Sequence, residues 1–418
     1  MKISGFAKKI AVDSGIGRLM EDLGAALSQK RDMLMLGGGN PAHIPQVEES
    51  CRLNMLELLE NPSKFAKAIG DYDPPQGNIG FIEAITKLLN EQLGWNIKTE
   101  NVALTNGSQT AFFLLFNMFA GRYEDGRTRK ILFPIAPEYI GYCDVALENG
   151  LFTAKKSLIE IIDEYTFKYH VDFENLKITD EIGAMCSSRP TNPSGNVLTD
   201  SEIIRLSELA AKNEIPLIVD NAYGAPFPNV IFTDAAAIWN SNIVFCMSLS
   251  KLGLPTARTG IIIASREIIS LVAKANAVMS LAPGGLGPAI ATEMAASGEI
   301  IRLANDVIRP YYQKKSEFAM KLFIDKLKGL DFLIHKSEGA FFLWLWFRNL
   351  PISSFELYQR LKARGVIVVS GHYFFPGMED QWQHKDQCIR VNYCPDEITM
   401  SKAAEIIADE VKIAYGKP

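Results

Sequence analysis

Short apolar runs alternate with longer amphipathic segments through the first two thirds of the chain. The apolar runs cover residues 130–133, 184–186, 216–219 and 242–247. Runs of this length without polar alternation are typical of strands that are buried on both faces of a parallel sheet. The segments between them have the helical period that crossover connections require. The pattern therefore predicts an α/β fold with a mostly parallel sheet.

One crossover helix has a clear start. Thr199 and Glu202 have the spacing of a capping box, in which two side chains satisfy the first free backbone N–H groups of a helix. Apolar residues then recur on one helical face at Ile203, Leu206 and Ala210. The strand at 216–219 follows, so this stretch predicts one complete crossover of the sheet.

The final third of the chain has a different pattern. A long helical period covers residues 299–326, and shorter apolar or amphipathic segments follow at 341–347, 355–364, 366–369 and 388–393. We interpret this as a smaller α+β domain. Before residue 48 there is little periodicity beyond a short helix at 16–27, so this segment is expected to pack with the smaller domain. The predicted division is 1–47, a large domain at 48–298 and a small domain at 299–418.

Composition narrows the class of protein. A chain of 418 residues with 48% hydrophobic and 22% charged residues suits two globular domains. The net charge of -5, without a lysine and arginine block, argues against a nucleic-acid partner. No signal peptide or long apolar run is visible, which favours a cytoplasmic protein without a membrane partner. The six dispersed cysteines predict buried thiols, and no metal site is expected.

Polar residues just after the apolar runs are the first candidates for chemistry, because ligands of open parallel sheets bind beyond the carboxyl ends of the strands. Asn192, Asp220 and Lys251 have this position. A desolvated Lys251 amine beside Arg258 would have a lowered pKa, and it could attack an aldehyde to form a Schiff base. Ser248 and Arg258 could hold a phosphate. The alternative is an ordinary surface-loop lysine.

A second anion site is predicted where Ser108 and Gln109 precede an apolar helical stretch. The free N–H groups and the dipole of a helix start attract a phosphate. Without a ligand, the same residues would be an ordinary helix cap.

Taken in order, these segments resemble the fold-type I, class I and II aminotransferases. The resemblance rests on Ser-x-Ser-Lys followed by Arg-x-Gly at 248–260, on Asp220 with Tyr223, and on Asn-Pro-Ser-Gly at 192–195. Arg258 lies one residue closer to the lysine than the common pattern has it. The matching motifs run from residue 37 to residue 390, nearly the whole chain. The resemblance implies the fold-type I architecture of pyridoxal 5′-phosphate (PLP)-dependent transferases.

The resemblance also implies a role for each cofactor-site residue. Lys251 carries PLP through a Schiff base, and Asp220 pairs with the protonated ring nitrogen, which makes the ring an electron sink. Tyr223 and Asn192 would bond the phenolic oxygen, and Tyr139 would stack on the ring. The phosphate contacts would be Ser108, Gln109, Ser248 and Arg258. Tyr72 matches a tyrosine that reaches the phosphate of the neighbouring subunit, which implies a homodimer with shared active sites.

On the substrate side, Arg390 lies where the family uses an arginine fork to bind the α-carboxylate, with Gly39 and Asn192 beside it. Finer matches at 37–41, 136–142 and 280–285 are similar to family members that move the amino group of valine to pyruvate. They imply a ping-pong reaction that gives 2-oxoisovalerate and alanine.

Alternatives remain both for single residues and for the function of the whole protein. Taken singly, Asp220 is also a common turn residue, Tyr139 a common core residue and Arg390 a common solvated strand residue. A β-lyase or an aminotransferase of other specificity would share the cofactor and the fold, because motifs do not separate proton transfer from elimination and do not define the side-chain pocket. A PLP-binding transcriptional regulator would need an added DNA-binding domain and a basic patch, and neither is visible. An inactive relative is disfavoured because Lys251, Asp220 and Arg390 are all present.

Overall fold

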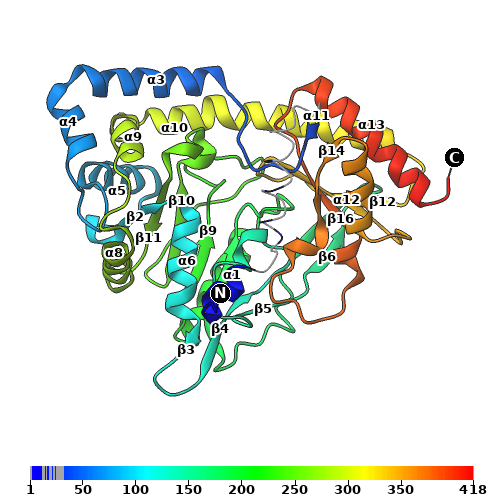
Figure 1. Cartoon of the computed structure of the whole chain (residues 1–418), viewed down its shortest axis with the longest axis horizontal. Coiled ribbons are helices and arrows are strands. Elements are labelled where there is room, and N and C mark those ends of the chain that lie inside the picture. Colours follow the sequence, from blue (N-terminus) through cyan, green and yellow to red (C-terminus); the bar gives the residue numbers. More distant parts are fainter. Residues whose placement is uncertain are drawn as a thin grey trace.

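Two large β-sheets and a long helix that runs past both of them organise the molecule (Figure 1). The computed structural model describes residues 2–11, 15, 17, 21, 24 and 33–417. The short helix expected at 16–27 lies mostly outside these residues.

The larger sheet has eight strands in the order β2-β11-β10-β9-β8-β4-β3, with β5 beside β4. Because β11 is antiparallel to both of its neighbours, β2 has the same direction as β10. The strands β10, β9, β8, β4 and β5 are parallel along the sheet, and β3 is antiparallel to β4. The expected mostly parallel sheet is confirmed. Its strands are β2 (Val102–Asn106), β3 (Gly121–Arg122), β4 (Thr128–Phe133), β5 (Phe152–Ala154), β8 (Ile182–Ser188), β9 (Leu217–Asp220), β10 (Ile243–Ser248) and β11 (Thr259–Ile263).

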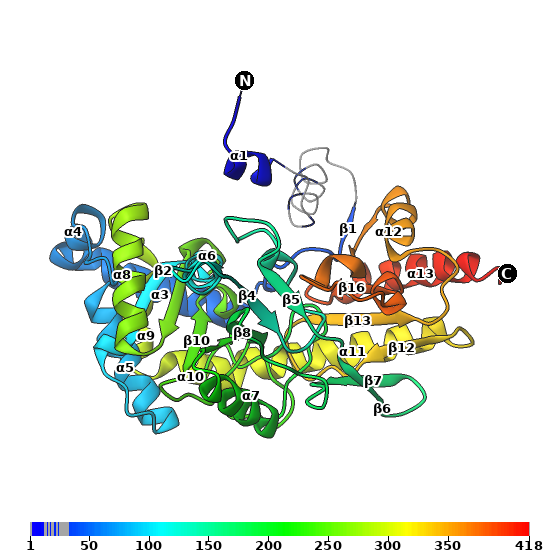
Figure 2. The ribbon, with the colours of Figure 1, turned by 90° about the horizontal axis from the view of Figure 1, so that it is seen from below.

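Helices cover this sheet on both sides, with α6 on one side and α7 on the other (Figure 2). All residues of β8 and β10 are buried, which explains why both strands are mainly apolar up to the serines at their carboxyl ends. The capping box of Thr199 and Glu202 is present at the start of α7. The helices around the sheet are α3 (Pro45–Glu60), α4 (Pro62–Gly70), α5 (Ile79–Leu93), α6 (Ser108–Phe119), α7 (Asp200–Lys212), α8 (Arg266–Ser280) and α9 (Leu286–Ala296).

The second sheet has six strands in the order β15-β16-β13-β12-β7-β6. Four come from the final third of the chain, whereas β6 and β7 form an antiparallel pair from its middle, and β7 pairs with β12 in parallel. The sheet therefore takes two strands from outside the range predicted for the small domain. Its strands are β6 (Leu158–Ile161), β7 (Thr166–His170), β12 (Phe332–His335), β13 (Phe342–Phe347), β15 (Val369–Ser370) and β16 (Cys388–Asn392).

The long helical pattern predicted at 299–326 forms three consecutive segments. They are α10 (Glu299–Arg302), a π-helical turn (Leu303–Ile308) and α11 (Arg309–Leu327). Helices α12 (Ser354–Ala363) and α13 (Glu397–Ala414) complete this part of the molecule.

The N-terminal segment contacts both parts of the molecule. Strand β1 (Leu34–Met35) pairs in parallel with β14 (Val366–Ile367), next to the second sheet. Helix α1 (Gly5–Ile10) differs from the expectation, because its Lys9 Nζ donates to the carbonyl oxygens of Asp144 and Ala146 in the larger part. The predicted domain boundaries stay a prediction.

Strand direction decides where a site can form. The carboxyl ends of β2, β4, β8, β9 and β10 all lie at one edge of the larger sheet. The chain crosses the whole sheet from β2 to β4, returns to β8 and then progresses to β9 and β10, so a crevice at this edge is expected.

Several expectations can be compared with the described residues. None of the described helices has the length and apolar character needed to cross a bilayer. No group of three or more metal-binding side chains occurs among them. The expectation of six buried thiols needs correction: all six cysteines are free, but Cys143 is exposed and Cys51 and Cys394 are partly exposed. Cys143 lies in a surface turn, and Cys394 lines the cavity described next.

Candidate active site

A cavity of about 940 Å³ opens at the carboxyl edge of the larger sheet. It brings together ten of the residues singled out from the sequence, which come from segments far apart along the chain. These residues are Gly39, Ser108, Gln109, Tyr139, Asn192, Asp220, Tyr223, Lys251, Arg258 and Arg390.

Lys251 lies in a 3-10 turn (Ser250–Leu252) that directly follows β10. Its Nζ donates to the carbonyl oxygen of Gly39 at 2.7 Å and lies 5.5 Å from the ring centroid of Tyr223. The pKa of the Lys251 amine is lowered to about 8, chiefly by burial; the charge of Arg390 contributes to the lowering, whereas Cys394 and Asp220 oppose it. A useful fraction of this amine is therefore unprotonated near neutral pH, as a nucleophile must be.

Asp220 is the last residue of β9, and its carboxylate accepts two hydrogen bonds. The Tyr142 hydroxyl donates to Oδ2 at 2.7 Å, and the backbone N–H of Ala222 donates to Oδ1 at 3.0 Å. Burial raises the pKa of Asp220, while these two donors and the charge of Lys251 oppose that rise. The result is a desolvated carboxylate that can pair with a cation in the cavity.

An anion cradle forms where β2 meets α6. Gly107 occupies the N-cap position with φ at +85°, and Ser108 begins the helix. The guanidinium of Arg258 lies so close to Gly107 that a Cβ at this position would overlap it. Glycine thus serves both the left-handed backbone and the approach of Arg258. Free helix N–H groups beside a guanidinium suit a phosphate.

Arg390 lies on β16 and is 2% exposed. Its Nη1 donates to Asn192 Oδ1 at 2.7 Å, and its Nη2 donates to the carbonyl oxygen of Gly37 at 2.6 Å. Its Nε is buried without a hydrogen-bond partner, and burial lowers the pKa of the guanidinium to about 10. An unpartnered buried donor is costly, so this arginine is suited to bind the carboxylate of a ligand.

Together these groups fit PLP. The cofactor carries an aldehyde, a basic ring nitrogen and a phosphate, which correspond to the Lys251 amine, the Asp220 carboxylate and the cradle at Gly107. The unpartnered Arg390 Nε leaves a further donor for the substrate.

Two predicted site residues do not line the cavity. Ser248 is 1% exposed, and its Oγ accepts a hydrogen bond from the backbone N–H of Ser250, which itself lines the cavity. Tyr72 follows α4 and is 82% exposed. The predicted phosphate contacts of Ser248 and Tyr72 stay predictions.

Sequence reasoning missed three site residues. Asn392 lines the cavity, and its Nδ2 donates to the carbonyl oxygen of Gly38 at 2.8 Å. The period of two along a strand would have placed it on the same face as Arg390. Ser250 is adjacent to Lys251 in the same motif. Tyr142 had no sequence signal, because its contact with Asp220 joins residues 78 positions apart.

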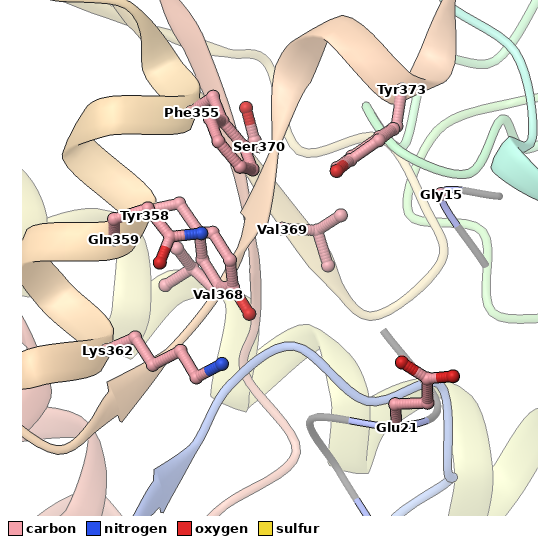
Figure 3. Close-up of a pocket in the computed structure, with 10 residues that line it drawn as sticks. All are labelled: Gly15, Glu21, Phe355, Tyr358, Gln359, Lys362, Val368, Val369, Ser370 and Tyr373. Carbon is pink, nitrogen blue, oxygen red and sulfur yellow. The ribbon is translucent and has the colours of Figure 1, made fainter. Parts of the chain in front are cut away.

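A second cavity of about 230 Å³ lies beside α12 (Figure 3). Its walls include Phe355, Tyr358 and Lys362 of α12 and Val369 of β15. Among the described residues, none of the predicted site residues lines it. The chemistry therefore belongs to the larger cavity.

Comparisons with known proteins agree with this geometry. Residues 59–407 match the family model "Aminotransferase class I and II". Over 417 residues, covering all of both chains, the sequence is 50% identical to the valine–pyruvate aminotransferase of Escherichia coli (strain K12). The valine–pyruvate aminotransferase structure from Salmonella typhimurium LT2 has 50% identity and a TM-score of 0.89, covering 96% of this chain and 100% of that one. A structure assigned to the amino-acid aminotransferases, from Psychrobacter arcticum 273-4, has 45% identity, complete coverage of both chains and a TM-score of 0.97. The chain thus belongs to the class I and II aminotransferases and is a PLP-dependent enzyme with the fold-type I architecture.

Proposed function

We propose that the enzyme transfers the amino group of valine to pyruvate and forms 2-oxoisovalerate and alanine in a ping-pong reaction. The observation that carries this proposal is the distribution of positive charge in the cavity. Within the described part of the chain, four cationic or potentially cationic side chains line it: His43, Lys251, Arg258 and Arg390. His43 is exposed and paired with Glu48. Lys251 and Arg258 are needed for the cofactor, so among the lining residues that the structure describes Arg390 alone is left for a substrate carboxylate.

A single described arginine that is not needed for the cofactor favours substrates with one carboxylate. A dicarboxylic acid such as 2-oxoglutarate would leave its second carboxylate without a partner among the described lining residues, and an unpaired buried charge is costly. The walls of the same cavity include the apolar side chains of Met35, Ala42 and Ile140, which suit a small aliphatic side chain. Similarity to the E. coli valine–pyruvate aminotransferase supports the same substrates.

The residues divide the work of the reaction. The lysine amine Nζ of Lys251 acts as the nucleophile toward the aldehyde and then as the base that removes the proton from the substrate α-carbon. Asp220 holds a proton on the ring nitrogen. Bound PLP supplies a ring that absorbs the negative charge at the substrate α-carbon. Arg390, held by Asn192 and Gly37, orients the α-carboxylate.

The test is a product assay with purified enzyme and PLP. With valine and pyruvate we expect alanine and 2-oxoisovalerate in equal amounts, and parallel lines in double-reciprocal plots. Replacing pyruvate by 2-oxoglutarate should lower kcat/KM by at least about tenfold, the effect of one unpartnered charged group. Efficient use of 2-oxoglutarate would refute the charge argument. Release of ammonia and pyruvate from a cysteine conjugate, without transamination of valine, would identify a β-lyase instead.

We also propose a homodimer with shared active sites. Large apolar side chains are exposed along α3, α4 and the end of α8, which lie on one side of the molecule (left in Figure 1). A single-chain protein rarely exposes so many apolar residues in neighbouring elements, so a second copy is the expected cover. These residues are Leu53, Met55, Leu56, Leu59, Ile69, Tyr72, Val278, Met279, Leu281 and Leu286. A cytoplasmic location and a role in amino-acid biosynthesis belong to the same proposal.

Complementation tests whether Tyr72 serves the partner's site. Lys251→Ala protein is mixed with Tyr72→Phe protein under conditions that exchange subunits. If Tyr72 reaches across, a hybrid dimer has both lesions in one site and an intact second site, so activity rises above that of either variant. If exchange is verified, the Tyr72 variant is impaired and activity does not rise, then Tyr72 does not act across the interface.

A further inference from the structure

Asp220 is held by a tyrosine that does not touch the cavity. Tyr142 lies at the end of a 3-10 turn (Ile140–Tyr142), is fully buried and does not line the cavity. Its hydroxyl donates to Asp220 Oδ2 at 2.7 Å. The backbone N–H of Ala222 is the other hydrogen-bond donor recorded for this carboxylate among the described residues.

The Tyr142 ring is fixed by aromatic neighbours. It lies parallel to Phe133, with an interplanar angle of 3° and a centroid distance of 5.5 Å. The rings of Phe116 and Tyr139 contact it edge-on at 5.2 and 5.3 Å. Because the ring is packed on several sides, the hydroxyl keeps one direction toward Asp220.

A second buried acid close to Asp220 makes the hydrogen bond from Tyr142 important for the ionisation of Asp220. Glu138, from the same short segment, accepts hydrogen bonds from the Ser187 hydroxyl at 3.0 Å and from Ser188 N at 2.9 Å. Ser188 is paired in register with Asp220 across β8 and β9. Burial raises the pKa of Glu138 to about 8, and the charge of Asp220 adds to that rise. The surroundings of Asp220 thus include a second acid, and the hydrogen bonds from Tyr142 and Ala222, together with the charge of Lys251, favour the ionised form of Asp220.

We propose that Tyr142 is a positioning residue that keeps Asp220 ionised and aimed at the ring nitrogen of PLP. The proposal rests on the assignment of Asp220 to that nitrogen. Without the Tyr142 donor, the proton shared between Asp220 and the ring nitrogen moves toward the carboxylate. The ring then withdraws fewer electrons, so removal of the substrate α-proton slows. Arg390 is not involved, so binding of the substrate carboxylate stays the same.

The experiment uses full-length holoenzyme and the variants Tyr142→Phe, Asp220→Asn and their combination. For Tyr142→Phe we expect kcat to fall by about ten- to a hundredfold, the usual effect of losing a hydrogen bond to a charged group, with an unchanged KM for valine. In the Asp220→Asn background the same change should alter kcat by less than about twofold, because the partner is already lost. Tyr393→Phe is the control: it also removes a buried tyrosine hydroxyl, which donates to the Ala340 carbonyl at 2.7 Å.

A spectroscopic readout separates positioning from simple destabilisation. A protonated ring nitrogen lowers the pKa of the nitrogen through which Lys251 carries the cofactor. The pH midpoint of the visible absorption should therefore rise in Tyr142→Phe and stay unchanged in Tyr393→Phe. If Tyr142→Phe does not fold, replacement of Tyr142 by 3-fluorotyrosine keeps the ring and strengthens the donor, and the midpoint should fall.

The two assignments can fail separately. A normal kcat and midpoint in folded Tyr142→Phe, with Asp220→Asn impaired, would overturn the role of Tyr142 alone. An unshifted midpoint with 3-fluorotyrosine would do the same. A normal kcat in Asp220→Asn would overturn the assignment of Asp220 itself.

Discussion

The cofactor end and the substrate end of the cavity are built differently. At the cofactor end, Ser108, Asp220 and Lys251 lie at or just after the ends of strands of one sheet, where ladder hydrogen bonds set their spacing. The substrate end is assembled from remote segments, because Arg390 of β16 is held by Asn192 and by the carbonyl oxygen of Gly37. The positions of the cofactor-binding residues are thus set by the sheet, whereas the position of the substrate-binding arginine depends on a few side-chain contacts that can change independently.

Lys251 should show the largest effect, because it belongs to both ends. Lys251 lies in the turn after strand β10 of the larger sheet, and its Nζ donates to the carbonyl oxygen of Gly39 at the substrate end. In Lys251→Ala we expect transamination to fall by more than about a thousandfold, since nucleophile and base are both lost. Lys321→Ala, an exposed lysine of α11, is the control for a lost lysine.

Borohydride reduction adds a direct chemical check. Peptide mapping of reduced wild-type enzyme should find the pyridoxyl group on Lys251. A label on another lysine would show that the cavity described here is not the reaction site.

Arg390→Lys should separate the two ends. A lysine cannot form the planar fork, so kcat/KM for valine should fall by about a hundredfold through KM. The cofactor's affinity and visible spectrum should stay those of the wild type. Asp220→Asn should show the reverse pattern, with a lower kcat and little change in KM. If both variants changed KM and spectrum together, the two ends would not be independent.

Gly107→Ala tests the phosphate cradle against a matched glycine. Gly107 and Gly126 have similar positive φ angles, +85° and +82°, but only at Gly107 would a Cβ meet Arg258. Both substitutions should destabilise the fold by about 1–2 kcal/mol. Only Gly107→Ala should also weaken PLP binding, by about tenfold or more, because the guanidinium must move. Equal PLP affinity in the two variants, measured by titration of cofactor-free protein, would remove Arg258 from the cradle.

The smallest expected effect is a shift in pH dependence. In cofactor-free enzyme the Lys251 amine, with its pKa lowered to about 8, captures PLP only when unprotonated, so the capture rate should rise through pH 8 and then level off. The charge of Arg390 contributes to this lowering. In Arg390→Met the midpoint should therefore move to higher pH. Arg360→Met, at an exposed arginine paired with Glu356, changes net charge equally and should leave it in place. Equal midpoints would show that the two ends do not communicate electrically.

The same contrast explains what the sequence could predict. Apolar runs and turn motifs predicted that Asn192, Asp220 and Lys251 follow strands closely, and the structure has Asp220 at the end of β9 and the other two in the segments after β8 and β10, because both signals are local. The link from Tyr142 to Asp220 and the bond from Arg390 to Gly37 join distant segments, and no local pattern encodes them. Ser250, rather than Ser248, lines the cavity because the chain turns directly after β10.

The pairing of β7 with β12 has a consequence for synthesis of the protein. Thr166 leaves the ribosome long before its partner Ile334 exists, so the hairpin of β6 and β7 waits with an open edge. An unpaired edge can recruit other chains. Production of residues 299–418 alone would leave β12 with the same open edge. The two sheets are thus interleaved along the chain, and neither the first 298 residues nor the last 120 are expected to fold as an independent unit.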